Sequence, residues 1–133
     1  MLPDPSLRNP LAISLGAIAG ALTRYYLTLW CINRFGGTFP YSTFLINLSG
    51  CFGLGFFVTF TLEQVAQIPR EASLLVTTGF FGAYTTFSTY ELESFVLLRR
   101  NGDLATASLY WAGSAVLGFI SIGLGVLLAR SLR

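Results

Sequence analysis

Histidine and lysine are both absent from this chain of 133 residues, and charge of either sign is scarce. All eight basic residues are arginines, six residues are acidic, and the formal net charge of +2 is too small to suggest a nucleic-acid partner. Without histidine, and with Cys31 and Cys51 far apart, no zinc or haem spacing exists. No nucleophile–base pair or phosphate-binding loop is present either, so we predict that the chain is not an enzyme.

The chain is instead rich in apolar residues. Hydrophobic residues make up 53% of the chain, charged residues 11%, and the mean hydropathy is +0.66, which indicates a membrane protein rather than a soluble one. Both cysteines lie in or beside apolar runs, so we expect buried free thiols. Residues 1–10 lack the basic start and cleavage site of a signal peptide, and we expect them to form a short tail or an interfacial segment.

Apolar stretches of about the ~20 residues that a bilayer requires predict one all-α transmembrane domain over residues 1–133. The expected spans are residues 11–32, 43–62, 72–98 and 104–128. Arginines are nearly balanced between the two membrane sides, with Arg8, Arg70, Arg130 and Arg133 on the side of the termini and Arg34, Arg99 and Arg100 on the other. Since a basic excess normally fixes orientation, this balance permits insertion both ways and an antiparallel homodimer.

The third stretch contains an unusual run of glycines and hydroxyl residues between Gly79 and Tyr90, with the sequence Gly-Phe-Phe-Gly-Ala-Tyr-Thr-Thr-Phe-Ser-Thr-Tyr. Non-helical backbone is tolerated in a membrane only where protein buries it or it lines a wet cavity. We therefore expect a helical half up to Phe81, a break, and a second half from about Ser88. The freed carbonyls and the hydroxyls would face something polar.

Several polar side chains within the expected spans have both a packing and a functional interpretation. Arg24 is the only charge in the first span, and it either reaches the headgroups or lines an anion-attracting vestibule. Asn47 shares a helix face with Thr43, and it either bonds to another helix or serves a polar pathway. Glu93 is a candidate gate or relay residue, whereas Glu91 is expected only to favour the N-terminal end of the second half-helix.

Small residues recur at helical spacings in two of the spans. Gly16 and Gly20 permit close approach of another helix to the first span. In the fourth span one helical stripe forms either a packing face or a row of hydroxyl donors, and it contains Tyr110, Ser114, Gly118 and Ser121. Donors and ring edges at mid-depth suit an anion, while carbonyls freed at the break suit a small hard cation.

Three motifs together carry a family resemblance. They are Gly-Ala-Leu-Thr-Arg-Tyr at residues 20–25, Gly-Thr-Phe at 37–39 with Thr-Phe-Leu-Ile-Asn-Leu-Ser-Gly at 43–50, and the run at 79–90. With these motifs the chain resembles the microbial fluoride channels of the Fluc (CrcB-type) family over nearly its whole length. The resemblance implies a plasma-membrane protein (inner membrane where a cell has two) that forms an antiparallel dual-topology homodimer with two pores. It also implies passive, selective fluoride export that lowers cytoplasmic fluoride and its toxicity.

The resemblance also assigns roles to residues. It implies a fluoride pore built from Asn47, Thr43, Phe87, Tyr90, Ser88, Thr89, Tyr110 and Ser114, with Glu93 beside this track. It places Arg24 in a vestibule. It implies a structural sodium ion, needed but not transported, on the backbone carbonyls of Gly82 and Thr85 of each subunit, and partners that are fluoride, membrane lipid and a second copy.

The chain departs from the family pattern at two positions. Tyr90 stands where phenylalanine is usual, and its phenol would either donate to fluoride or block the path. Gly118 stands where some members carry a hydroxyl.

Two alternatives remain. A proton-coupled small multidrug exporter also has four short spans and dual topology, but it needs a membrane-embedded carboxylate, usually early in the chain, where this sequence carries Arg24. A structural membrane subunit would use Asn47 and the Thr-Thr-Phe-Ser-Thr run only to hold helices together.

Overall fold

The computed structural model describes residues 5–63, 68–101 and 103–132, and every regular element in those ranges is a helix. The three long helices are α1 (Pro5–Phe35), α2 (Tyr41–Glu63) and α6 (Leu104–Ser131). Each of these is long and apolar enough to cross a membrane. The prediction of an all-α membrane domain is therefore confirmed for the described residues.

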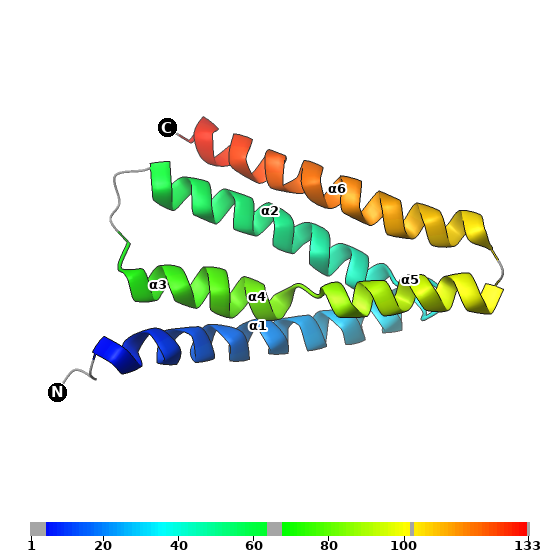
Figure 1. Ribbon diagram of the computed structural model, residues 1–133, viewed down its shortest axis with the longest axis horizontal. Coiled ribbons are helices and arrows are strands. Elements are labelled where there is room, and N and C mark those ends of the chain that lie inside the picture. Colours follow the sequence, from blue (N-terminus) through cyan, green and yellow to red (C-terminus); the bar gives the residue numbers. More distant parts are fainter. Residues whose placement is uncertain (1–4, 64–67, 102, 133) are drawn as a thin grey trace.

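Four shorter elements connect α2 to α6: α3 (Arg70–Leu74), η1 (Leu75–Phe81), α4 (Gly82–Tyr84) and α5 (Phe87–Asn101). Together they run the length of the molecule, with α3, η1 and α4 lying alongside α1 (Figure 1). The start of α1 and the end of α6 consequently lie at the same end of the molecule (Figure 1). This composite segment corresponds to the stretch 72–98 of the sequence.

Two helix boundaries differ from the predicted ones. α1 begins at Pro5, so residues 5–10 are helical rather than a tail, which leaves an interfacial segment as the other expectation, and residues 1–4 lie outside the described ranges. Proline is well tolerated at the start of a helix because the first N–H groups lack helical partners anyway. α5 continues to Asn101, so Arg99 and Arg100 are helical rather than part of the predicted turn. In the last turn of α5 their positive charge complements the helix dipole.

The first half of the composite segment packs against α1 through glycines. A Cβ atom on Gly16 would lie 2.0 Å from the Leu75 carbonyl oxygen, and one on Gly20 would lie 2.2 Å from the Phe80 carbonyl oxygen. No side chain fits at such distances, so only glycine lets the two backbones come this close. The prediction that this face of α1 admits another helix is confirmed.

α6 packs along α2 through the stripe of small residues. Its buried positions recur at spacings of mostly three and four residues, and they are Ala107, Tyr110, Ser114, Gly118, Gly125 and Ala129. A Cβ atom on Gly125 would lie 2.2 Å from the Phe52 carbonyl oxygen of α2. The predicted stripe is therefore buried at three of its four positions, and Ser121 is half-buried.

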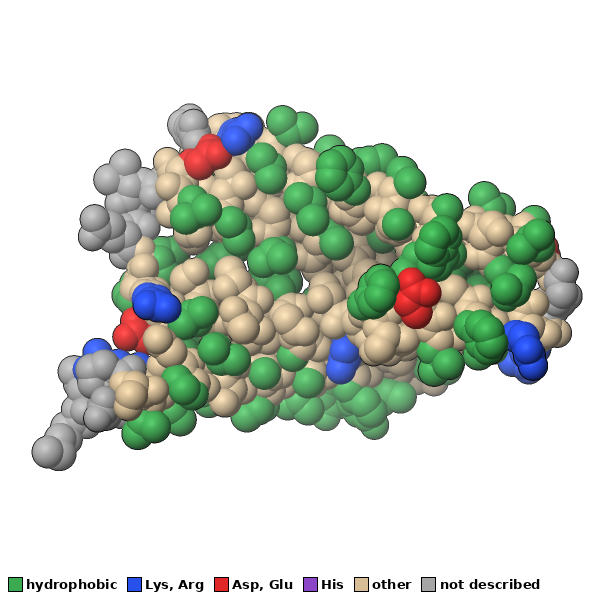
Figure 2. Space-filling model, viewed as in Figure 1, with side chains coloured by type: hydrophobic (Ala, Val, Ile, Leu, Met, Phe, Trp, Pro, Cys, Tyr) green, Lys and Arg blue, Asp and Glu red, His purple; other side chains and the backbone are tan. Residues whose placement is uncertain are grey.

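Hydrophobic side chains cover much of the surface, while most charged side chains lie toward the two ends of the molecule (Figure 2). Phe119 is 81% exposed and Leu109 is 74% exposed. Apolar exposure of this kind is unusual on a soluble monomer, and it matches the membrane assignment. Cys31 is buried and Cys51 is half-buried, and both are free thiols as expected.

Candidate functional site

The composite segment loses its regular helical form near its centre. η1 is a π-helix, and the Gly82 amide at its end donates to the Thr77 carbonyl, five residues earlier. Thr85 is extended, with φ −76° and ψ 158°, and α5 begins at Phe87. The interruption therefore lies at Thr85 and Thr86, and it is shorter than the sequence suggested. Such an interruption removes helical partners from several backbone groups.

Asn47 of α2 bonds to the backbone at this interruption. Its Nδ2 donates to the Thr86 carbonyl at 3.0 Å, and its Oδ1 accepts from the Thr86 amide at 2.8 Å. One side-chain amide thus satisfies both backbone groups of one residue, so the interhelical bond left open from the sequence is present. An asparagine amide has two N–H donors, and the second makes no hydrogen bond within the described part of the chain, so it remains for a ligand.

Two carbonyls at the interruption have lost their helical donors. The Thr86 amide, which would donate to Gly82 in a continuous helix, donates to α2 instead. The Thr89 amide, which would donate to Thr85, donates to the Thr86 hydroxyl at 3.3 Å. The Arg24 guanidinium of α1 donates to the Thr85 carbonyl, with an Nη1–O distance of 3.3 Å. Arg24 therefore contacts the interruption directly.

The freed carbonyls have the right chemistry for a small cation. In the described part of the chain no group of three or more His, Cys, Asp and Glu residues could hold a metal ion, which leaves backbone oxygens as the candidate ligands. Hard cations such as sodium prefer oxygen, and a full shell needs about six ligands. The Gly82 and Thr85 carbonyls of one chain fit the ligand type, but the Thr85 oxygen already accepts from the Arg24 guanidinium, and the two oxygens are too few for a complete site.

The Thr86 side chain caps α5. Its hydroxyl accepts from the Thr89 amide and donates to the Thr89 hydroxyl at 2.9 Å, which is the arrangement of a helix N-cap. Ser88 and Thr89, both expected as pore hydroxyls, are exposed and are not among the residues that line the pocket described next. Thr89 serves the cap in this chain.

Five of the predicted site residues line one pocket of about 570 Å³, which we call the inner pocket: Asn47, Thr85, Phe87, Tyr90 and Ser114. It lies between α2, the interruption, α5 and α6, and side chains such as Leu54 and Phe119 give it a largely apolar wall. The Ser114 hydroxyl is buried and has no hydrogen-bond partner among the described residues. A buried hydroxyl without a partner is costly, so Ser114 is well suited to bind a ligand.

The Tyr90 hydroxyl bonds to α6 and does not serve the inner pocket, although the ring lines it. The hydroxyl donates to the Trp111 carbonyl of α6, which fixes α5 to α6. The ring lies beside the Phe87 ring, with centroids 5.8 Å apart, and beside the Tyr110 ring at 5.6 Å. Trp111 also donates from Nε1 to Glu91 at 3.1 Å. Neither bond could be expected from the sequence, because no local pattern links residues 20 or 21 positions apart.

Glu93 joins three helices through its carboxylate. The Thr43 hydroxyl of α2 donates to Oε1 and the Tyr110 hydroxyl of α6 donates to Oε2, both at 2.9 Å. Thr43 and Asn47 therefore use the same face of α2 to reach the composite segment, as their spacing predicts. The Glu93 cluster and the inner pocket are adjacent, because the Tyr110 ring packs on Tyr90.

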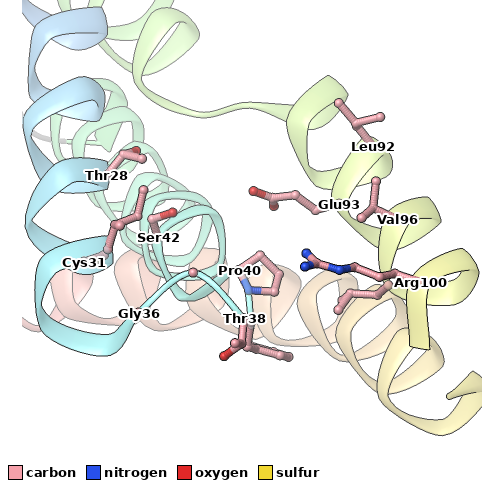
Figure 3. A pocket seen from close by; sticks show the side chains of 14 residues that line it. Thr28, Cys31, Gly36, Thr38, Pro40, Ser42, Leu92, Glu93, Val96 and Arg100 are labelled. Atoms are coloured by element: carbon pink, nitrogen blue, oxygen red, sulfur yellow. The ribbon is translucent and has the colours of Figure 1, made fainter.

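Glu93 also faces a second cavity of about 650 Å³, which we call the outer pocket. The end of α1, the loop 36–40, the start of α2 and α5 form its walls. Figure 3 shows the Glu93 and Arg100 side chains extending from α5 toward that loop. The loop turns at Gly36, whose φ of +79° favours glycine. The outer pocket was not predicted from the sequence.

Known proteins resemble this chain over nearly its full length. A family model described as "CrcB-like protein, Camphor Resistance (CrcB)" matches residues 11–126. Three curated relatives are each named "Fluoride-specific ion channel FluC". The one from Trichormus variabilis is 56% identical over 98% of this chain and 94% of its own. The one from a Synechococcus species is 52% identical over 98% of both chains. The one from Chloroflexus aurantiacus is 44% identical over 93% of this chain and 97% of its own.

These relatives are named as channels, which agrees with the prediction that the chain is not an enzyme. Their similarity, together with the three long apolar helices, makes the chain a multi-pass protein of the plasma membrane. Because the match covers most of the chain, and because the motifs pointed the same way, this chain belongs to the CrcB-like family, the Fluc (CrcB-type) channels of the sequence resemblance.

Proposed function

We propose that this protein is a fluoride-selective ion channel, through which fluoride leaves the cell passively so that its cytoplasmic concentration and toxicity fall. The observation that most supports this is the inner pocket. The remaining N–H of Asn47, the partnerless hydroxyl of Ser114 and the rings of Phe87 and Tyr90 surround one space. The name of the relatives points to the same ion.

Fluoride is small and strongly hydrated, so a pore must replace its water with close donors. An amide N–H, a hydroxyl and the positive edges of aromatic rings all suit an anion. None of these groups carries a formal charge. Binding in a channel has to be favourable enough for entry yet weak enough for release, and neutral donors meet both requirements without a deep trap.

A second copy of the chain would complete the pore. Phe87 is 74% exposed, and an ion path that is open to hydrocarbon on one side cannot stay polar. Another protein surface must therefore close it. Since the arginines are nearly balanced between the two sides, a copy inserted in the opposite orientation fits the proposal. Such an antiparallel homodimer would contain two equivalent pores.

We also propose that a structural sodium ion lies at the centre of this dimer. The Gly82 and Thr85 carbonyls of two subunits would contribute four oxygens, which is closer to a full shell than one chain allows. A bound cation would offset the repulsion between the freed carbonyl dipoles where the two subunits meet. The dimer should then unfold at a lower temperature in sodium-free buffer than in sodium, a measurement that is independent of flux.

Ion flux from liposomes tests the proposed function. Purified protein is reconstituted, and efflux of fluoride and of chloride is recorded with ion-selective electrodes, first in sodium and then after sodium removal. We expect rapid fluoride efflux, no chloride efflux, and loss of fluoride efflux without sodium. A folded dimer that releases no fluoride would overturn the channel proposal. Fluoride efflux that is unchanged without sodium would overturn only the sodium site.

A proton-coupled exporter of cationic drugs is the alternative, and Glu93 is the observation in its favour. Its carboxylate lies within an apolar segment and is only half-buried. Both of its oxygens already accept hydrogen bonds, however, and an exchange site has to release such partners in each cycle. Uptake of a fluorescent cation into the same liposomes under a pH gradient distinguishes the two functions, because a channel for fluoride should give none.

A further inference from the structure

Two adjacent arginines end α5, and their side chains have different surroundings. The Arg99 guanidinium lies over the Phe95 ring, with its Cζ 5.6 Å from the ring centroid. Arg100 lines the outer pocket together with Glu93, and Figure 3 shows its guanidinium extending into the space in front of the loop 36–40. Compensation of the helix dipole applies to both arginines equally. It does not account for the position of Arg100 in the pocket.

Arg100 is also the source of positive charge in the outer pocket. Of the residues that line it, only Glu93 and Arg100 are charged. Ion pairs within the described ranges join Arg8 to Glu71 and Arg130 to Glu63, at the opposite end of the molecule. Arg100 takes part in neither pair. Without Arg100, the lining of the outer pocket would carry only the negative charge of Glu93, which repels anions.

The outer pocket connects to the inner pocket through a continuous series of contacts. Glu93 lines the outer pocket and accepts a hydrogen bond from Tyr110. The Tyr110 ring packs on Tyr90, which lines the inner pocket. The packed rings of Tyr110 and Tyr90 therefore separate an anion beside Arg100 from the donor groups of the inner pocket, and the proposed route passes along them.

We propose that the outer pocket is the wet mouth of the anion route and that Arg100 draws small inorganic anions into it by offsetting the charge of Glu93. This inference depends on the proposed channel function. A charge in a cleft with low-dielectric walls raises the local concentration of its counter-ion and the rate of entry. The effect falls with ionic strength, because the Debye length shortens from about 30 Å at 0.01 M salt to about 8 Å at 0.15 M.

The test compares four proteins: the wild type, Arg100→Gln, Arg100→Lys and the matched control Arg99→Gln. Both arginines are exposed in the last turn of the same helix, so each substitution removes one charge with little effect on packing. Fluoride efflux from liposomes is recorded at constant fluoride and at low and physiological ionic strength. For each variant, the elution volume of the dimer in size-exclusion chromatography and the temperature of thermal unfolding verify the fold.

We expect Arg100→Gln to lower the initial rate about threefold or more at low ionic strength, Arg100→Lys to keep most of the rate, and Arg99→Gln to stay near wild type. The deficit of Arg100→Gln should shrink at physiological ionic strength. The wild-type rate should itself fall as salt is added, an effect that needs no variant. Equal rates in Arg100→Gln and Arg99→Gln, with a conducting wild type, would overturn the inference and leave the channel function intact. A folded wild type that conducts no fluoride would overturn both.

Discussion

The Asn47 amide and the Glu93 carboxylate each make two hydrogen bonds to neighbouring segments, but their partners are of different kinds. Asn47 bonds to the backbone of Thr86, whereas Glu93 bonds to the side chains of Thr43 and Tyr110. The amide thus replaces helical hydrogen bonds that the interruption removes. The carboxylate links helices whose own backbone hydrogen bonds are already complete.

The two pockets beside these residues also differ in the kind of chemical group that lines them. Neutral donors and rings make up most of the polar lining of the inner pocket, where Glu91 is the charged residue, whereas charged groups of opposite sign, Glu93 and Arg100, extend into the outer pocket from the same helix, α5. Neutral donors can coordinate an ion that has lost its water, and charges act over a longer distance on an ion that is still hydrated. In the proposed channel, selectivity would therefore arise at the inner pocket and recruitment at the outer one.

The largest effect is expected at Asn47, because it serves both backbone and ligand. Asn47→Asp loses the N–H that donates to the Thr86 carbonyl and adds a negative charge where an anion should bind. We expect fluoride efflux to be abolished, and the fold to lose about 1–3 kcal/mol for the backbone group left without a partner. Flux assays and thermal unfolding measure the two effects separately.

Asn33→Asp is the control for Asn47→Asp, since Asn33 is exposed near the end of α1. It adds the same charge away from the inner pocket, although near the outer one, and it should keep most of the flux at physiological ionic strength, where this charge is screened. Undiminished flux in Asn47→Asp would remove Asn47 from the pore and leave it only its bonds to Thr86.

Phe87→Ile separates ligand binding from folding at the inner pocket. The ring is 74% exposed in the single chain, so its replacement should leave the monomer fold unchanged. It removes the positive ring edge, and we expect fluoride efflux to fall by about tenfold or more, the scale of about 1.4 kcal/mol. Phe35→Ile, which changes an exposed ring that does not line the inner pocket, is the control. Normal flux in Phe87→Ile would show that the ring only packs in the dimer.

The three long apolar helices and the stripe on α6 could be predicted because they depend on residue type and spacing alone. Gly16 and Gly20 predicted a close helix contact for the same reason, and the Gly79–Tyr90 run predicted irregular backbone. The pairing of Asn47 with Thr86, 39 positions away, could not be predicted, because it follows from how α2 lies against the interruption. The π-helix η1 could not be predicted either, since no residue pattern distinguishes it from an α-helix.

Tyr110→Phe and Tyr90→Phe form a matched pair at the boundary between the two regions. Both rings are buried and both phenols donate one hydrogen bond, Tyr110 to the Glu93 carboxylate and Tyr90 to the Trp111 carbonyl. Bonds to a charged group contribute about 1.5–3 kcal/mol, and neutral ones about 0.5–1.5 kcal/mol. We therefore expect the larger loss of unfolding free energy in Tyr110→Phe.

The same pair should differ in flux. Tyr90→Phe keeps the ring in the inner pocket and removes only the hydroxyl that bonds to Trp111, so efflux should stay near wild type. Tyr110→Phe leaves one oxygen of Glu93 without its donor, which strengthens the negative field at the outer pocket and should slow fluoride entry. If Tyr90→Phe lost most of its flux instead, the phenol would be a pore donor after all.

The smallest effect concerns the end of the molecule that carries the outer pocket. Hydrogen bonds from the Thr106 hydroxyl and amide hold the pKa of the Asp103 carboxyl below its usual value at the N-terminus of α6. Because the pKa is lower in the folded state, this cap contributes fully above the unfolded pKa of about 3.9, and its contribution is lost as the pH falls through the folded value. Asp103→Asn keeps an acceptor that does not titrate, so thermal unfolding between pH 7 and pH 3 should show a smaller acid-induced decrease than in wild type. If acid destabilised Asp103→Asn and the wild type equally, the acid-sensitive group would lie elsewhere in the chain. It would not be the Asn47–Thr86 pairing, which contains no titratable group.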